Sequence, residues 1–160
     1  MTMPCNERSL EKKEERAVIL IGHGSRAAGA DGDMERIADR LRENGEPIVE
    51  VCRMGRGIPF TEVLERCVRK GARTVIVIPY FLHFGVHLRQ DIPEILRKAA
   101  AGRPEVRLIL GRHLGYDEAL VALVEKRIGE SLDLSDIRGM DEVPIDRHPG
   151  EAPAGREGRS

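Results

Sequence analysis

Two glycine-flanked segments of the chain carry histidines that could bind a metal together. Residues 22–26 read GHGSR, and residues 83–91 read HFGVHLRQD. Neutral imidazole is a natural ligand for divalent ions of the first transition row. If His23 and His87 share one crevice, they form a half-site with open coordination positions. Such a site suits a metal that is held transiently for transfer rather than a closed structural site.

The spacing of these histidines also fits a simpler explanation, in which each one hydrogen-bonds the backbone of its own loop. His83 lies four residues before His87, but an HxxxH spacing carries little weight in a loop. His113 and His148 are expected to be solvated side chains. His23 and His87 are therefore the predicted metal ligands and catalytic residues, with backbone hydrogen bonding as the open alternative.

Other chemistries fit the two segments less well. Ser25, His87 and Asp91 could form a nucleophilic triad, but the GxSxG motif that presents such a serine is absent. The glycines of residues 22–29 depart from GxGxxG and no Walker A motif is present, so no nucleotide is expected. A flavodoxin-like phosphate or nucleotide binder that uses this turn at a helix start stays a third possibility.

The predicted elements place both segments at one edge of a sheet. From residue 16 onward, apolar β-branched runs alternate with amphipathic helical segments, a pattern typical of βαβ units. We predict a single flavodoxin-like or chelatase-like α/β lobe, with a four-stranded parallel sheet of order 2-1-3-4 and helices on both faces. Ligands of such sheets bind beyond the carboxyl ends of the strands, where the winding reverses. The expected strands are residues 17–22, 47–54, 74–82 and 106–111.

The last predicted helix covers about residues 116–131 and is expected to bury Leu120, Leu123, Val124 and Ile128. We predict three regions along the chain: a polar N-terminal arm at residues 1–15, the α/β domain at 16–132, and a disordered tail at 133–160 that is rich in Pro, Gly and charge. A length of 160 residues, with 41% hydrophobic and 33% charged residues, fits one globular domain.

Composition also limits the partners and the compartment. A net charge of −1 gives no electrostatic reason to expect nucleic acid. Three cysteines without a CxxC motif favour reduced thiols in a cytoplasm. The N-terminus lacks the apolar core of a signal peptide, and no apolar run approaches the roughly 18 residues of a membrane span. We therefore expect a cytoplasmic protein with no membrane partner.

The motifs on the first and third strands resemble those of the small sirohydrochlorin chelatases of the class II chelatase group. The resemblance rests on the first strand leading into residues 22–26, on Pro79-Tyr80-Phe81-Leu82 leading into Gly85-Val86-His87, and on Asp91-Ile92-Pro93, and it covers about residues 17–131. It implies insertion of Co²⁺, Fe²⁺ or Ni²⁺, as a substrate, into sirohydrochlorin or a related tetrapyrrole of cobalamin or siroheme biosynthesis. It also implies a homodimer of one-lobe chains.

The resemblance makes His23 and His87 the metal-handling pair. We predict that Arg26 and Arg89 hold the peripheral carboxylates of the tetrapyrrole, since guanidinium groups suit carboxylates. Arg112 also falls near this edge, although any of the three arginines could be a solvated loop residue. An apolar wall against the flat ring is expected from the segment between the third strand and the next helix, with the predicted contacts Phe81, Leu82, Phe84, Gly85 and Val86.

One departure from the family pattern concerns an acid. Similar proteins commonly carry a glutamate shortly after the second strand, whereas this chain has Met54-Gly55 there. Glu50 or Glu62 could substitute, the acid could be dispensable, or the chain could have diverged or lost activity. A non-catalytic tetrapyrrole or metal carrier with the same pocket is therefore the alternative function.

Overall fold

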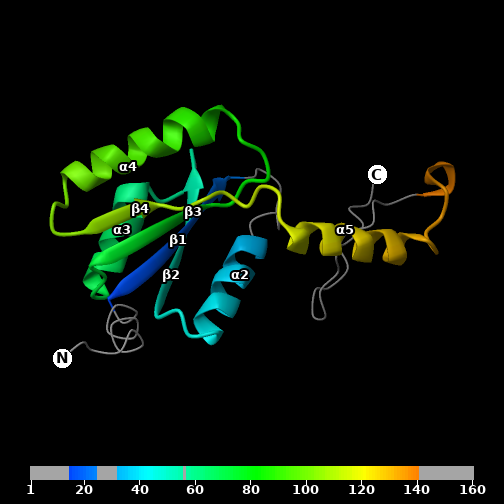
Figure 1. The fold of residues 1–160 in the computed structure, drawn as a ribbon, viewed down its shortest axis with the longest axis horizontal. Helices are drawn as coiled ribbons and strands as arrows, with labels where there is room; N and C mark the ends of the chain where they lie inside the picture. The colour runs from blue at the N-terminus through cyan, green and yellow to red at the C-terminus, as the bar shows by residue number, and fades with distance from the viewer. Residues whose placement is uncertain (1–14, 25–31, 56, 141–160) are drawn as a thin grey trace, which may run out of the picture. The chain divides into compact units, whose positions relative to one another are not determined.

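The computed structural model describes residues 15–24, 32–55 and 57–140. Four parallel strands form one sheet in the order β2-β1-β3-β4 (Figure 1). The predicted fold class and strand order are therefore confirmed. The strands are β1 (Arg16–His23), β2 (Ile48–Met54), β3 (Thr74–Pro79) and β4 (Arg107–Leu110).

The described chain divides into two compact units at residues 117 and 118. The first unit holds the sheet with three α-helices, α2 (Gly32–Glu43), α3 (Phe60–Arg69) and α4 (Ile92–Ala101). A π-helical turn, His87–Asp91, leads directly into α4. The second unit holds α5 (Glu118–Ser131) and a short 3-10 turn, Ile137–Gly139.

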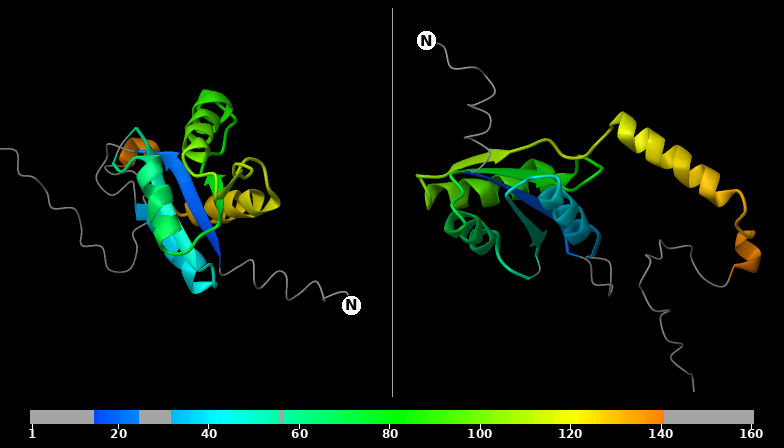
Figure 2. Two further views of the ribbon diagram at one scale, coloured as in Figure 1. Left: turned by 90° about the vertical axis from the view of Figure 1, so that its left-hand side faces the viewer. Right: turned by 90° about the horizontal axis from the view of Figure 1, so that it is seen from below.

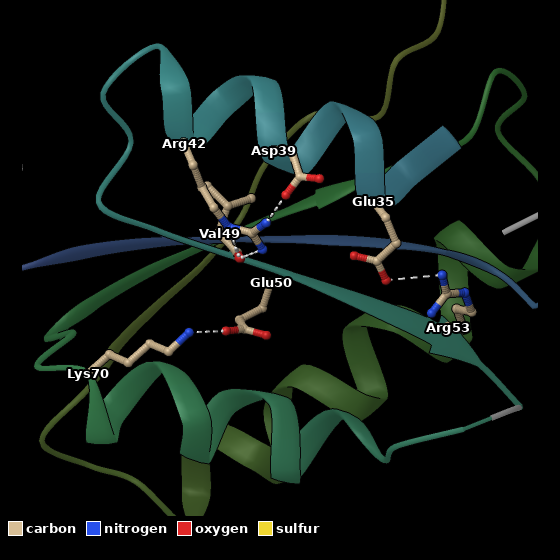
Figure 3. A network of polar contacts seen from close by, with 7 residues as sticks. All are labelled: Glu35, Asp39, Arg42, Val49, Glu50, Arg53 and Lys70. Carbon is tan, nitrogen blue, oxygen red and sulfur yellow. Dashed lines mark hydrogen bonds and ion pairs between the residues drawn. The ribbon is translucent and has the colours of Figure 1, made fainter. Parts of the chain in front are cut away.

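The two faces of the sheet are covered by different helices (Figure 2). β2 passes between α2 on one side and α3 on the other (Figure 3). Alternate residues of β1 enter two separate cores, Ile19 on the face of α3 and α4 and Leu20 on the face of α2. This burial on both faces explains why β1 is an uninterrupted apolar run. The larger core includes Ile19, Ile21, Val63, Leu64, Val77 and Ile92.

Local sequence explains the helices that pack on the sheet. Pro59 precedes the first turn of α3, where its fixed φ suits helix initiation. One face of α2 buries Met34 and Ala38, one turn apart, as the i, i+4 pattern predicts. The amino ends of α2 and α3 follow the carboxyl ends of β1 and β2 along the chain.

The expectation for the last helix is wrong in one respect. The helix forms as α5, but none of its residues is buried, and Leu123, Val124 and Ile128 are exposed. An apolar helix face becomes buried only against another layer, and α5 and the 3-10 turn are the only regular elements described in the second unit. None of the helices in the described ranges combines the length and the apolar composition needed to cross a membrane.

Both cysteines in the described chain are buried thiols with raised pKa values. Cys52 is 3% exposed and Cys67 is 0% exposed. Burial raises the pKa of Cys52 from its ordinary value of 9.0 to about 11, although the positive charge of Arg53 lowers this pKa. Burial first, and the Glu50 carboxylate second, raise the pKa of Cys67 to about 12. The folded protein therefore holds both thiol protons more tightly than the unfolded chain does.

We predict that these thiols make the fold less stable at alkaline pH. Their stabilising contribution is complete below pH 9.0 and is lost as the pH rises through about 11 and 12. Between about pH 9 and 12, the free energy of unfolding should fall less steeply with pH in Cys67→Ala than in the unmodified protein. The two slopes should differ by up to about 1.4 kcal/mol per pH unit, because one titrating proton has been removed. Urea unfolding at several pH values measures both slopes, and equal slopes in the variant and the unmodified protein would contradict the prediction.

Candidate functional site

The carboxyl ends of β1 and β3 meet at one edge of the sheet. The two strands are parallel neighbours, with Ile21 opposite Pro79. The Tyr80 N–H donates to the Ile21 carbonyl at 2.7 Å, which extends the pairing one residue past β3. The chain that follows β3 therefore begins beside His23, the last residue of β1. Parallel pairing alone brings together the two segments that the sequence singled out.

His23 and His87 lie against each other at this edge. Their ring centroids are 4.6 Å apart with an angle of 84° between the ring planes. The Phe81 ring packs edge-on against His23 as well, at 5.0 Å and 76°. Both imidazoles are exposed to solvent. The structure thus places the predicted pair together, while its role as metal ligands stays a prediction.

Gly22 lets α2 approach the strand beside His23. Successive side chains of a strand point to opposite faces, and a Cβ on Gly22 would lie 2.8 Å from the sulfur of Met34 on α2. A larger residue would have to displace Met34, which is buried. Packing against Met34 therefore favours glycine at position 22, the residue before His23.

Three apolar side chains beyond β3 stand exposed near the imidazole pair. Leu82 is 53%, Phe84 57% and Val86 64% exposed. Phe81 differs from them, because it is partly buried and packs on the core. Gly85 is exposed, with open space where a Cβ would be. Exposed apolar residues in one segment indicate a surface that a flat apolar ligand can cover.

An arginine and a histidine contact the ring of Phe84. The Arg89 guanidinium carbon lies 5.0 Å from the centroid of the Phe84 ring, within the range of a cation–π contact. The His113 ring centroid lies 5.6 Å from that of Phe84. Gly115 has φ +53°, and a Cβ there would lie 2.9 Å from Nε2 of His113. His113, expected to be merely solvated, therefore packs beside the predicted wall.

The remaining predicted residues are placed as follows. Arg112 is exposed just beyond β4. His83 is exposed in the loop after β3, where its backbone carbonyl accepts the Gly85 N–H at 3.1 Å. Arg26 and His148 lie outside the described residues, so their predicted roles are not tested.

Neither acid considered as a substitute for the missing glutamate is free beside His23. Glu50 lies in the first half of β2 and binds Lys70 at 2.6 Å (Figure 3). Glu62, in the first turn of α3, pairs with Arg66 at 3.4 Å. Within the described chain, no group of three or more His, Cys, Asp or Glu could hold a metal. A metal at this edge would therefore find the two imidazoles as its candidate protein ligands among the described residues.

An ion pair that the sequence analysis missed lies close to the end of β2. Arg53 contacts Glu35 of α2 at 3.1 Å (Figure 3). Arg53 is opposite Gly22 in the register, one residue before the level of His23. Only the register of the sheet reveals this neighbourhood, because Glu35 and Arg53 are 18 residues apart in the chain.

The π-helical turn supplies a second contact that sequence reasoning missed. Nδ1 of His87 and Oδ2 of Asp91 are 2.5 Å apart. The sequence pattern groups Asp91 with His87 only in a nucleophilic triad that lacks its motif, and it predicts no role for Asp91 beside a metal-binding histidine. The π-helical conformation of this turn was not predicted.

These features define a class of protein: a parallel α/β lobe with an exposed histidine pair and an apolar wall at the carboxyl edge of its sheet. A sequence model of the CbiX family matches residues 17–131. The chain therefore belongs to the CbiX family.

Individual relatives agree with this assignment. The sirohydrochlorin ferrochelatase of Priestia megaterium is 32% identical over 117 residues, which are 72% of this chain and 44% of that protein. The structure of the sirohydrochlorin chelatase SirB from Bacillus subtilis subspecies spizizenii, in complex with cobalt, has a TM-score of 0.67 and 29% identity, covering 72% of this chain and 50% of that chain.

A shorter solved relative matches along nearly its whole length. It is a CbiX protein from Marinobacter aquaeolei VT8 whose description refers to cobalamin (vitamin B12) biosynthesis. Its TM-score is 0.64 at 26% identity, and the match covers 74% of this chain and 98% of that one. The chain spans about half the length of the curated relatives that it matches.

Proposed function

We propose that this chain inserts a divalent metal into sirohydrochlorin or a related tetrapyrrole, with the metal as a substrate and without a nucleotide. The observation that carries the proposal is the exposed pair of His23 and His87, with ring centroids 4.6 Å apart, beside apolar side chains. The names of the relatives support it, since one is a sirohydrochlorin ferrochelatase and another is a sirohydrochlorin chelatase with bound cobalt. The candidate metals are Co²⁺, Fe²⁺ and Ni²⁺.

The histidine pair suits the first steps of insertion. A hydrated metal must lose part of its water shell before ring nitrogens can bind it. Two imidazoles can replace part of that shell and still leave positions open for the tetrapyrrole. In a structural site with four protein ligands, some of these ligands would have to dissociate before the metal could enter the ring. The small number of ligands is therefore an advantage for a metal that must leave.

The same pair suits the removal of protons. The pyrrole nitrogens lose two protons as the metal enters the ring, and an imidazole is a good acceptor near neutral pH. Because the two histidine rings touch and both are exposed to solvent, one can keep the metal while the other is released to accept the two protons in turn and pass each to water. His23 and His87 share these two roles in the proposal.

The surroundings of the pair suit the substrate. Leu82, Phe84 and Val86 offer an exposed apolar surface to a flat macrocycle. Arg89, whose guanidinium lies on Phe84, would pair with a carboxylate at the rim of such a ring. The roles of Arg26 and Gly85 rest on the sequence motif alone. Together these residues would hold the ring face and its acidic rim.

A carrier that binds the tetrapyrrole or the metal without turnover is the second candidate. It is favoured by Met54-Gly55 at the end of β2, where the family pattern has an acid, and by the engagement of Glu50 and Glu62 in ion pairs. The carrier keeps the same site, so only a measurement of turnover separates the two functions.

We predict that His23→Ala and His87→Ala each slow metal insertion by about 100-fold or more, because each removes one of the two imidazoles that share these roles. The measurement is anaerobic incubation of the protein with sirohydrochlorin and Co²⁺, Ni²⁺ or Fe²⁺ in turn, followed by the absorbance change of the ring. His83→Ala is the matched control, since it removes an exposed imidazole from the same loop. It should leave the rate unchanged.

The outcomes separate the candidates. Acceleration by the unmodified protein that is lost in His23→Ala and His87→Ala, with circular dichroism unchanged, supports the chelatase. Full activity in both variants contradicts it. Tetrapyrrole binding without acceleration by any of the three metals supports the carrier.

We also propose that the chain acts as a homodimer in the cytoplasm. Support for a dimer comes from α5, where Leu123, Val124 and Ile128 are exposed, and from relatives of about twice the matched length. Support for the cytoplasm comes from Cys52 and Cys67, which are free thiols.

We predict that the protein sediments as a dimer and that Val124→Glu shifts it to a monomer, because a charge would be buried in the contact. Ala122→Glu is the control, since it places the same charge roughly 200° away around the helix. Analytical ultracentrifugation gives both masses. A monomeric unmodified protein, or equal masses for the two variants, would argue against this interface.

A further inference from the structure

Asp91 makes a contact that its position in the helix does not require. It lies where the π-helical turn runs into α4, with helical backbone angles of φ −69° and ψ −48°, so it is part of one continuous helical segment. In this helix the Asp91 side chain makes no capping hydrogen bond. Its carboxylate lies 2.5 Å from Nδ1 of His87 instead. The Asp91 carboxylate therefore contacts the His87 imidazole and caps no backbone N–H of α4.

The π-helical turn explains how the two side chains come to face each other. The Ile92 N–H donates to the His87 carbonyl, which closes the wide turn. Leu88 is 6% and Ile92 0% exposed, so the turn is fixed to the core at both ends. The side chains just before these anchors, His87 and Asp91, remain 49% and 43% exposed. Single π-helical turns within helices are frequent at functional sites.

We propose that Asp91 is a positioning residue for His87, accepting the Nδ1 proton so that the unprotonated Nε2 is presented to the metal substrate. A neutral imidazole carries one proton, and the hydrogen bond of one ring nitrogen decides which nitrogen is free. Ligand histidines in metal sites commonly donate their second N–H to a carboxylate in this way. The inference rests on the proposed function, because it assigns a role toward the metal that is to be inserted.

The contact with Asp91 gives His87 a different environment from that of His23. His87 is held by a carboxylate on one side and by the His23 ring on the other. The ring contacts of His23 are with Phe81 and His87. The arrangement makes His87 the more firmly held ligand, so that of the two imidazoles His23 is the one that can leave the metal and accept a proton when the ring nitrogens bind.

The first readout is the tautomer of His87 in the metal-free protein. Nitrogen-15 NMR of the imidazole side chains at about pH 8, where an ordinary histidine is neutral, distinguishes a proton on Nδ1 from one on Nε2. We expect the Nδ1-protonated form in the unmodified protein and in Asp91→Glu, which keeps a carboxylate. In Asp91→Asn, whose amide can donate to Nδ1, we expect this preference to be lost.

The second readout is Co²⁺ binding in the absence of tetrapyrrole, followed by calorimetry. Asp91→Asn should weaken binding by about 10- to 100-fold, the usual effect of removing a partner of a ligand histidine. Glu94→Gln is the matched control, because Glu94 lies one turn along in α4, is exposed and pairs with Lys98 at 2.7 Å. It removes the same charge and should change neither readout.

Three results would overturn the proposal: an Nε2-protonated His87 in the unmodified protein, an unchanged tautomer in Asp91→Asn, or an equal loss of Co²⁺ affinity in Glu94→Gln. None of these readouts depends on turnover. If insertion fails while the tautomer and the Co²⁺ effects are as expected, the positioning role stands and the carrier is the function.

Discussion

The parallel pairing of β1 with both β2 and β3 is the constraint on which the site depends. It sets His23 opposite Met54 and, through the hydrogen bond from Tyr80 to Ile21, starts the histidine-bearing segment beside β1. β1 is fixed in the sheet because its side chains enter the cores on both faces. A shift of the β1–β3 register by one residue would turn the side chains of one strand to the opposite face and would separate the histidine pair. Sheet packing, rather than a direct bond between the histidines, therefore holds the pair together.

The arrangement also explains why the pair is exposed. Its walls come from short segments beyond the strands, and Leu82, Phe84 and Val86 present apolar surface to solvent. Removing water from a site strengthens the electrostatic interactions inside it. Among the described residues of the sheet-bearing unit, the side chains of Leu82, Phe84 and Val86 are left uncovered. Under the proposed function, a flat macrocycle lying on these apolar side chains would exclude water from that side of the pair.

The sequence predicted the strand order and the loop neighbourhood because these follow from general rules. Buried apolar runs, βαβ connections and the meeting of carboxyl ends are properties of the pattern. The contact between His87 and Asp91 depends on a π-helical turn, and the hydrophobic periodicity of the sequence does not predict such a turn. The engagement of Glu50 with Lys70 and of Arg53 with Glu35 depends on which strand faces which helix. The exposure of α5 was missed because an apolar helical pattern does not reveal what covers it.

The central claim is that His23 and His87 together hold a metal at the edge of the sheet. X-ray absorption at the cobalt edge, on protein loaded with one equivalent of Co²⁺, tests it directly because imidazole rings scatter in a recognisable way. The account predicts two imidazole ligands with water or other oxygen in the remaining positions, and one imidazole in either His23→Ala or His87→Ala. A cobalt environment without imidazole, or one that is the same in both variants as in the unmodified protein, would contradict the account.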